Sequence, residues 1–267
     1  ALTFDPHPAS IVRPASAPVP LTTPARRAEL LLALGLDAVL VQPADASLVA
    51  LSAETFYREI LRNRLGAIAF VEGQDFRFGA GRAGDMAMLT RLAAADGASV
   101  DVVAPVTVDG EPVSSSRLRA LIAEGNVAAA ASLATAPHRA SGVVVEGARR
   151  GRTLGFPTAN LGPVATLLPA EGVYAARASI EGDGRHRTWF PAAVNVGPAP
   201  TFGVVTSGVE VHLVGYAGDC YDRVLHVDFL QKLRDTRRFA SADDLRACLA
   251  TDVARAVEIA SASRQEP

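Results

Sequence analysis

The order of apolar and polar positions divides the chain into two parts with different periodicities. Up to about residue 135, segments with apolar residues at helical spacing alternate with short apolar runs, a pattern typical of helices and buried strands in succession. The predicted helices span 22–34, 52–65, 85–95 and 116–124, and the predicted strands span 37–41, 67–71 and 99–104. Strand–helix–strand order indicates a Rossmann-like α/β domain with a parallel sheet.

Residues 140–230 lose the helical spacing and show short strand patterns separated by turns that contain Gly and Pro. The predicted strands span 142–145, 172–180, 192–196, 209–214 and 224–229. Such spacing indicates an antiparallel barrel or sandwich. Residues 241–259 follow as one amphipathic helix capped by Ser241. The change of pattern predicts two domains, over 1–135 and 138–262.

Composition narrows the classes of partner. The net charge is −2, so no basic field predicts a nucleic-acid partner. The two cysteines, Cys220 and Cys248, form no CxxC pair, which argues against a disulfide framework or a zinc site. No apolar run reaches the roughly 18–20 residues of a membrane helix, and no signal-peptide pattern opens the chain. We expect a cytoplasmic protein; the sequence does not indicate an oligomeric state.

The segment 147–160 interleaves glycines with arginines and ends in Thr158 and Asn160. Its candidate phosphate-binding residues are Gly147, Arg149, Gly151 and Arg152. It is not a Walker A loop, because the Gly-Lys-Ser/Thr ending is absent. Thr158 and Asn160 are two apart and share a face of an extended segment, where their neutral oxygens could hold Mg²⁺ together with phosphate. By composition alone, a plain turn followed by a strand is the better interpretation.

Glu210 stands inside the apolar segment Val209–Leu213. Glu is depleted in strands, so its position needs a reason. A carboxylate at a barrel opening could accept a hydroxyl proton; equally, Glu210 could face solvent on the outer side of an alternating strand. His212 shares its face, and a lone strand histidine is more often a packed hydrogen-bonding residue than a ligand.

Four segments, 141–161, 195–203, 209–213 and 229–234, resemble the riboflavin kinase family, and they do so in the family's order. The resemblance implies a six-stranded antiparallel barrel with a C-terminal helix, which transfers the γ-phosphate of ATP to riboflavin and makes FMN with Mg²⁺. It implies that Gly147 and Arg152 belong to the ATP loop and Thr158 and Asn160 to the Mg²⁺–ATP site. It places Glu210 at the base position.

The resemblance also assigns Arg234 to the flavin side of the site. The family usually has Glu two residues after this arginine, where this chain has Thr236. That departure concerns flavin contacts near Arg234 and leaves the phosphate site unaffected.

The first half resembles the FMN adenylyltransferase domain that bacteria fuse to this kinase, through segments 2–8, 73–79 and 114–119. The candidate nucleotide-site residues are Asp75, Ser114, Ser115, Ser116, Arg117 and Arg119. Serines and arginines at the start of a helix predict a phosphate site at its free N–H groups. A plain serine cap with two solvated arginines is the alternative.

The family's adenylyltransferase opens with a strand and an HxGH turn whose histidines bind ATP phosphates. No such pair occurs among the five histidines, which are His7, His138, His186, His212 and His226. We therefore expect an incomplete first domain, and a chain that phosphorylates riboflavin but does not convert FMN to FAD at a useful rate. The rival hypothesis is a flavin- or nucleotide-binding regulatory module without turnover.

Overall fold

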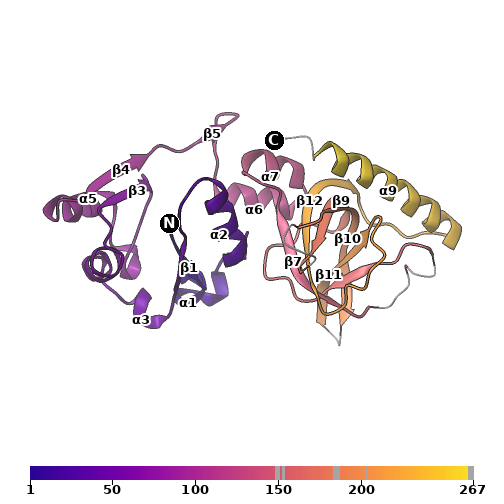
Figure 1. Cartoon of the computed structure of the whole chain (residues 1–267), viewed down its shortest axis with the longest axis horizontal. Coiled ribbons are helices and arrows are strands. Elements are labelled where there is room, and N and C mark those ends of the chain that lie inside the picture. The colour runs from indigo at the N-terminus through magenta and orange to yellow at the C-terminus, as the bar shows by residue number, and fades with distance from the viewer. Residues whose placement is uncertain (148–150, 152–153, 183–186, 202–203, 264–267) are drawn as a thin grey trace. The chain divides into compact units, whose positions relative to one another are not determined.

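The computed structural model describes residues 1–147, 151, 154–182, 187–201 and 204–263 (Figure 1). The chain forms two compact units: residues 1–18 with 31–113, and residues 19–30 with 114–267. We call them the N-terminal unit and the barrel unit. The division assigns 19–30 and 114–135 to the barrel unit, and the domain boundary between 135 and 138 stays a prediction.

The strands of the N-terminal unit pair in twos. β1 (Leu2–Asp5) is parallel to β2 (Leu40–Pro43), and β3 (Ala69–Gly73) is parallel to β4 (Ser99–Val103). A short antiparallel hairpin follows, whose strands β5 (Thr107–Val108) and β6 (Glu111–Pro112) have two residues each. The parallel pairs agree with the α/β prediction. The strand expected over 37–41 lies three residues later at its start, because Leu40 is the residue that pairs with Leu2.

The helices of this unit are α1 (Pro8–Val12), η1 (Pro14–Ser16), α3 (Ala46–Val49), α4 (Ala53–Thr55), η2 (Phe56–Arg64), η3 (Ala80–Arg82) and α5 (Met86–Ala95). Of these, α5 packs against β4. The helix expected over 52–65 forms as α4 followed by the π-helical η2, a hydrogen-bond pattern that apolar spacing does not distinguish. The buried core of this unit is Ala53, Phe56, Tyr57, Ile60, Leu61, Phe70, Phe78, Leu89, Leu92 and Ala93.

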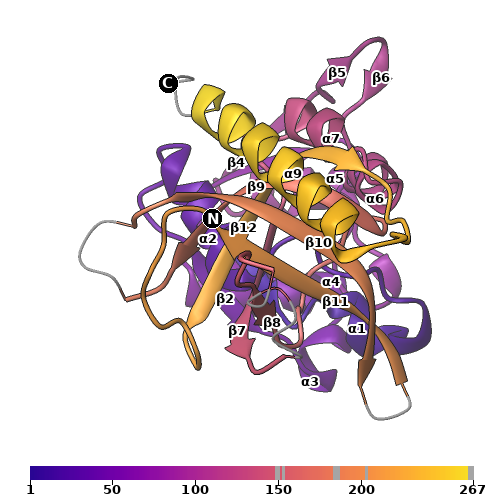
Figure 2. The same ribbon diagram turned by 90° about the vertical axis from the view of Figure 1, so that its right-hand side faces the viewer.

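The barrel unit contains a closed barrel in the order β10-β11-β8-β7-β12-β9, with every neighbouring pair antiparallel (Figure 2). Its strands are β7 (Arg139–Val145), β8 (Ala159–Leu161), β9 (Gly172–Ile180), β10 (Phe190–Thr201), β11 (Val204–Leu213) and β12 (Val224–Arg234). Mostly small and β-branched side chains fill the interior, with Tyr174 and Phe229 as its large members. The six-stranded barrel predicted from the resemblance is confirmed.

In the described part of the chain, the helices that belong wholly or partly to this unit include α2 (Pro24–Ala33), α6 (Ser115–Ala123), α7 (Val127–Leu133) and α9 (Ala242–Ala262). The C-terminal helix α9 packs on β9, β10 and β12 (Figure 2). Arg234 at the end of β12 donates to the buried Asp252 of α9 through Nη2 at 2.8 Å and Nε at 3.1 Å. No helix among the described residues is long and apolar enough to span a membrane.

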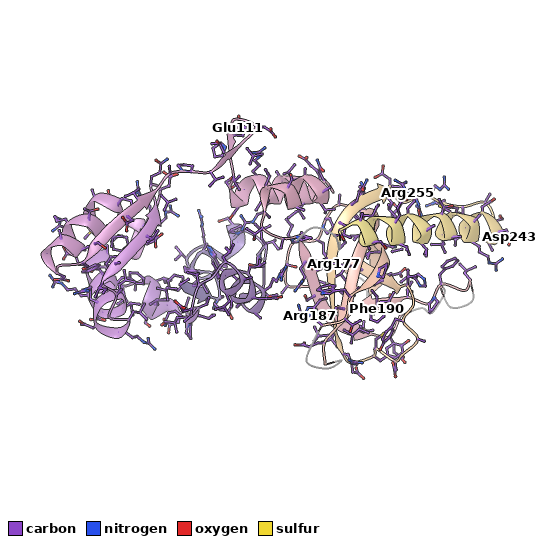
Figure 3. All side chains as sticks on the ribbon, turned by 45° about the horizontal axis from the view of Figure 1, so that its top comes forward. Glu111, Arg177, Arg187, Phe190, Asp243 and Arg255 are labelled. Atoms are coloured by element: carbon purple, nitrogen blue, oxygen red, sulfur yellow. The ribbon has the colours of Figure 1, made fainter. Side chains whose placement is uncertain are left out.

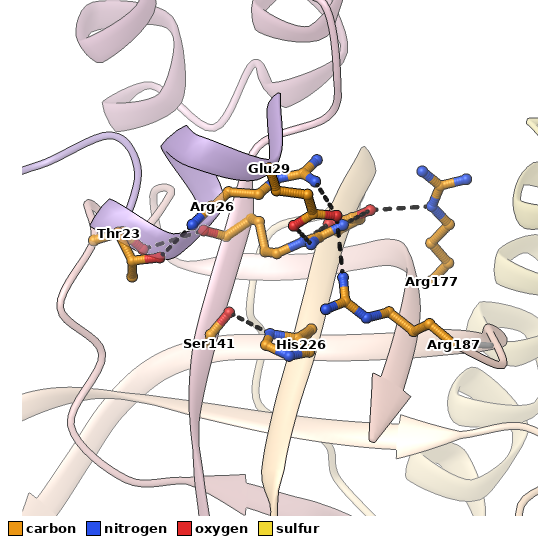
Figure 4. A network of polar contacts seen from close by, with 10 residues as sticks. Thr23, Arg26, Glu29, Ser141, Arg177, Arg187 and His226 are labelled. Atoms are coloured by element: carbon orange, nitrogen blue, oxygen red, sulfur yellow. Dashed lines mark hydrogen bonds and ion pairs between the residues drawn. The ribbon is translucent and has the colours of Figure 1, made fainter. Parts of the chain in front are cut away.

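A set of charges built around the buried pair Asp228 and Arg139, here called the Asp228 network, lies on the outer face of β7, β12 and β9 (Figure 4). Asp228 has no exposed surface and accepts from Arg139 Nη2 at 3.0 Å and Arg177 Nε at 3.1 Å. Glu29 of α2 bridges Arg139 and Arg187 at 3.2 and 3.3 Å. This network therefore fastens the segment 19–30 to the barrel wall.

The Trp189 ring lies against the same arginines. The guanidinium carbons of Arg139 and Arg177 are 4.9 and 5.0 Å from the ring centroid, close enough for cation–π attraction. Figure 3 labels Arg177 and Arg187 among the side chains of the barrel. Because Trp189 is the chain's single tryptophan, its fluorescence reports on this wall of the barrel.

Candidate functional site

Glu210 points outward from β11. Val209 and Val211 on either side are buried in the barrel core, whereas Glu210 is exposed, as strand alternation requires. Of the two interpretations open from the sequence, the outer-face position is the observed one. Among the described residues, the Glu210 carboxylate has no ion-pair or hydrogen-bond partner. It is therefore available to an incoming hydroxyl group.

Two asparagines flank Glu210 across the sheet. Asn160 on β8 and Asn195 on β10 are its direct register partners. Directly opposed residues share a face, with Cβ atoms about 4.5–5.5 Å apart. Asn160, Glu210 and Asn195 thus form a continuous outward row, here called the polar row. Asn195 was given no role from the sequence, because only the strand register reveals that it adjoins Glu210.

Gly147 lies directly against the amide of Asn160. A Cβ atom built on Gly147 would come within 2.1 Å of Asn160 Nδ2. Any side chain at 147 would therefore displace the asparagine, so glycine is needed for close approach. The chain that leaves β7 passes over the polar row at this point, which brings two of the predicted site residues together.

A tight turn leads back from Gly151 to Thr158. The Gly151 carbonyl accepts from Phe156 N at 2.9 Å, and a Cβ atom at 151 would lie 2.2 Å from the Phe156 carbonyl oxygen and 3.4 Å from Thr158 Oγ1. Gly151 and Thr158 are thus packed together, one residue before β8 begins. Arg149 and Arg152, the predicted arginines of this loop, lie outside the described residues.

The side chains near Thr158 suit a hard cation only in part. Thr158 and Asn160 offer neutral oxygens and Glu210 a carboxylate, the ligand types that Mg²⁺ accepts while it keeps waters or phosphate oxygens. Across the described part of the chain, no group of three or more His, Cys, Asp and Glu side chains could hold a metal ion. The Mg²⁺ site at Thr158 and Asn160 therefore stays a prediction.

Sequence reasoning treated His212 as an ordinary packed residue, and the structure gives it a specific partner. Its Nδ1 lies 2.8 Å from the carbonyl oxygen of Pro157, and its ring meets Phe156 edge-on at 5.6 Å between centroids. His212 follows Glu210 by two residues and shares its outward face. It therefore links β11, the strand that carries Glu210, to the segment that precedes Thr158.

Arg234, the predicted flavin residue, is engaged elsewhere in this structure. Besides Asp252, its guanidinium donates to the Asp235 carbonyl and lies 5.7 Å from the Phe239 ring. Burial lowers the pKa of Arg234, but the hydrogen bonds and charge of Asp252 outweigh it and raise that pKa above its ordinary value. In this structure Arg234 joins β12 to α9 through Asp252, and its flavin role stays a prediction.

The predicted adenylyltransferase residues fall on both units. Asp75 is exposed just after β3 in the N-terminal unit, whereas residues 114–119 belong to the barrel unit. Ser114 caps α6 by accepting from Arg117 N at 3.2 Å, and Arg119 Nε donates to the Val19 carbonyl at 3.0 Å. Ser115 and Ser116 occupy the first turn. The serine cap is therefore observed, and the phosphate site stays a prediction.

Comparisons with known proteins agree with both halves of this picture. Residues 134–260 match the riboflavin kinase family and residues 1–117 match the FAD synthetase family. The chain is 36% identical over 251 residues to the bifunctional riboflavin kinase/FMN adenylyltransferase of Escherichia coli, covering 94% of this chain and 79% of that protein. It is 37% identical to the protein of the same description from Pseudomonas fluorescens, covering 97% and 82%.

A solved structure from Streptococcus pneumoniae, described as a macrolide-efflux protein, superposes with a TM-score of 0.79 at 30% identity, covering 94% of this chain and 80% of that one. The efflux description belongs to that protein and is not transferred. The matched families, the identity to the bifunctional relatives and the six-stranded barrel all agree. The chain belongs to the family of bifunctional riboflavin kinase/FMN adenylyltransferases.

Proposed function

We propose that the barrel unit transfers the γ-phosphoryl group of ATP to the 5′-hydroxyl of riboflavin, with Glu210 as the general base. The observation that carries this assignment is the Glu210 carboxylate, which has no partner among the described residues, in a row with Asn160, against whose amide Gly147 packs closely. The row lies within the segment that matches the riboflavin kinase family.

The proposed reaction moves one proton and one phosphoryl group. Glu210 accepts the hydroxyl proton while the freed oxygen forms a bond to the γ-phosphorus, and the bond from that phosphorus to the ADP oxygen breaks. The protein's contribution is positioning and charge neutralisation more than covalent chemistry. A bound Mg²⁺ would neutralise charge on the phosphate oxygens. Thr158 and Asn160 would hold that ion, and Gly147, Arg149, Gly151 and Arg152 would cradle the nucleotide.

Supporting this division of roles, the neutral oxygens and the carboxylate lie at different points of one surface. Thr158 comes from the segment just before β8, Asn160 from β8 itself, and Glu210 from the neighbouring strand β11. An attacking hydroxyl beside Glu210 would thus approach phosphates held near Asn160 without crossing the barrel. Asp75, Ser114, Ser115, Ser116, Arg117 and Arg119 remain our candidates for the second, adenylyl-transferring site.

The deciding experiment is incubation of the chain with riboflavin, ATP and Mg²⁺, followed by chromatographic separation of riboflavin, FMN and FAD. We expect FMN to accumulate with time and ADP to form in equal amount. Riboflavin that binds, by fluorescence quenching, but stays unphosphorylated would favour the regulatory binding module instead. Omission of Mg²⁺ with added chelator should stop FMN formation and leave riboflavin binding in place.

A further inference from the structure

His212 holds the carbonyl group that directly precedes Thr158. Its ring lies on the outward face of β11, with Nδ1 2.8 Å from Pro157 O and the ring edge-on to Phe156. A carbonyl oxygen only accepts hydrogen bonds, so Nδ1 must carry the proton. Both the neutral ring with that tautomer and the charged ring meet this condition. The contact therefore fixes which nitrogen is the donor without requiring a charge.

The position of this contact matters because it lies directly before Thr158 and ahead of the pairing between β8 and β11. Pro157 has no N–H of its own to donate. The strand pairing between β8 and β11 begins only at Ala159, which faces Val211. On the other side, Phe156 is held by Gly151 through its N–H and through close backbone packing. His212 thus connects the turn over 151–157 to β11, the strand that carries Glu210.

The consequence is geometric. Thr158 follows Pro157 directly, and Asn160 faces Glu210 across the strand pair. A shift of the Pro157 carbonyl would move Thr158 relative to Asn160 and Glu210, whereas the register of β8 would hold Asn160 in place. A misplacement of about 1 Å at a reacting centre can cost on the order of 10²-fold in rate. This single hydrogen bond is thereby coupled to the distance between the Thr158 oxygen proposed to hold Mg²⁺ and the Glu210 carboxylate.

We propose that His212 is a positioning residue for the Mg²⁺–ATP side of the kinase site. By donating from Nδ1 to Pro157 O and packing against Phe156, it sets the place of Thr158 relative to Glu210. The proposal rests on the kinase function proposed above. It differs from a catalytic role, because His212 acts through the backbone of residue 157 and needs no contact with either substrate.

The test uses four variants of the full chain, namely His212→Asn, His212→Gln, His212→Phe and His212→Ala. Asparagine places its amide nitrogen the same number of bonds from Cα as Nδ1, whereas glutamine places it one carbon further. Phenylalanine keeps a ring for Phe156 but has no donor. We expect kcat/KM for ATP to fall about 10–100-fold in the Phe, Ala and Gln variants, and His212→Asn to recover most of it. Riboflavin affinity should stay within about twofold throughout.

Three measurements separate positioning from a merely structural role: steady-state kinetics with each substrate varied, Mg²⁺–ATP binding by calorimetry, and thermal unfolding. The matched control is His226→Asn, a histidine on the outer face of β12 whose Nδ1 bonds Ser141 at 2.8 Å. This control should leave ATP kinetics unchanged. Equal kinetics for wild type and His212→Phe would overturn the proposal. If that variant does not fold, equal losses in His212→Asn and His212→Gln would overturn it.

The two proposals fail in different ways. A wild-type chain that makes no FMN refutes the kinase assignment and, with it, this role of His212. A wild-type chain that makes FMN while every His212 variant matches it in ATP kinetics refutes only the positioning role. A selective loss for ATP that asparagine rescues supports both.

Discussion

Asp228 on β12 and Glu210 on β11 occupy the same kind of position, an outward site on a barrel strand whose two chain neighbours are buried in the core. Their surroundings are opposite. Asp228 is fully buried and ion-paired with Arg139 and Arg177, whereas Glu210 is exposed and unpaired among the described residues. The covering segment makes the difference, since α2 lies over Asp228, whereas the direct cross-strand neighbours of Glu210 are Asn160 and Asn195.

This comparison separates two uses of a carboxylate on one barrel. The Asp228 charge stabilises the fold, because removing it would leave the guanidinium groups of Arg139 and Arg177 without their shared counter-ion. The Glu210 charge contributes little to stability in the free protein and remains available for proton transfer. Mutations on the side of the barrel around Asp228, here called the buried wall, should therefore change the free energy of unfolding. Mutations on the side around Glu210, here called the exposed wall, should change turnover instead.

The largest effect is expected at the exposed wall. Glu210→Gln should lower kcat by about 10²–10⁴-fold, because loss of a general base removes proton transfer from the attacking hydroxyl. Riboflavin and Mg²⁺–ATP binding should stay within about twofold, measured by fluorescence quenching and calorimetry. Glu181→Gln, in the exposed turn after β9, is the matched control and should be active. Turnover of Glu210→Gln within two- to threefold of wild type would remove Glu210 from the base role.

At the buried wall, Asp228→Asn should lower the free energy of unfolding by about 3–5 kcal/mol, since Arg139 and Arg177 lose their shared carboxylate. Urea unfolding followed by Trp189 fluorescence reports this directly, because the ring lies over both arginines. Glu210→Gln in the same assay should change stability by no more than about 0.5 kcal/mol. Equal stability of the two variants would contradict the contrast between the walls.

A smaller effect is expected from Gly147→Ala. The added methyl group would meet Asn160 Nδ2, so the asparagine must rotate away from the polar row. We expect kcat/KM for ATP to fall about 10–100-fold with riboflavin binding retained. Gly73→Ala, where a Cβ atom meets nothing within 4 Å, is the control for the glycine change itself.

A double variant sharpens this test. If Gly147→Ala acts by displacing Asn160, then the double variant Gly147→Ala/Asn160→Ala should have the same kcat/KM for ATP as Asn160→Ala alone. Strictly multiplicative losses in the double variant would show that the two residues act independently, and the close approach would then have no kinetic consequence.

The two walls also differ in how far the sequence predicted them. Alternation around Glu210 and the motif order were enough to identify Glu210, Thr158 and Asn160 as candidates. The adjacency of Asn195 was not accessible, because it depends on the register between β10 and β11. The strand β8 is only three residues long, too short for a periodic signal.

The Asp228 network was missed for a similar reason: its members come from α2, β7, β9 and β12, which only the folded chain brings together. Two register shifts, between Phe229 and Gln231 and between Lys232 and Arg234, explain why β12 was predicted to end at 229. Each bulge interrupts the alternation on which the prediction relied. The barrel itself was predictable because its motifs resemble a known family, whereas its long-range pairs were not.

The smallest expected effect is a pH dependence of stability at the buried wall. Burial lowers the pKa of His226, and the positive charges of Arg187 and Arg139 lower it further. Its Nε2 is buried without a hydrogen-bond partner among the described residues, which also favours the neutral ring. An unfolded histidine takes up a proton near pH 6.5, whereas the folded one does so only at lower pH.

The unfolded chain therefore binds more protons in that window, and stability falls as pH drops below about 6.5, by at most about 1.4 kcal/mol per pH unit for one proton. Burial likewise lowers the pKa of His138, so a second proton adds to the slope. His226→Asn removes one of the two groups, and its unfolding free energy should fall less steeply between pH 6.5 and 5. Urea unfolding followed by Trp189 fluorescence at each pH measures both slopes. Identical slopes would mean that His226 titrates alike in the folded and unfolded chain, and the buried wall would then owe its acid sensitivity to other groups.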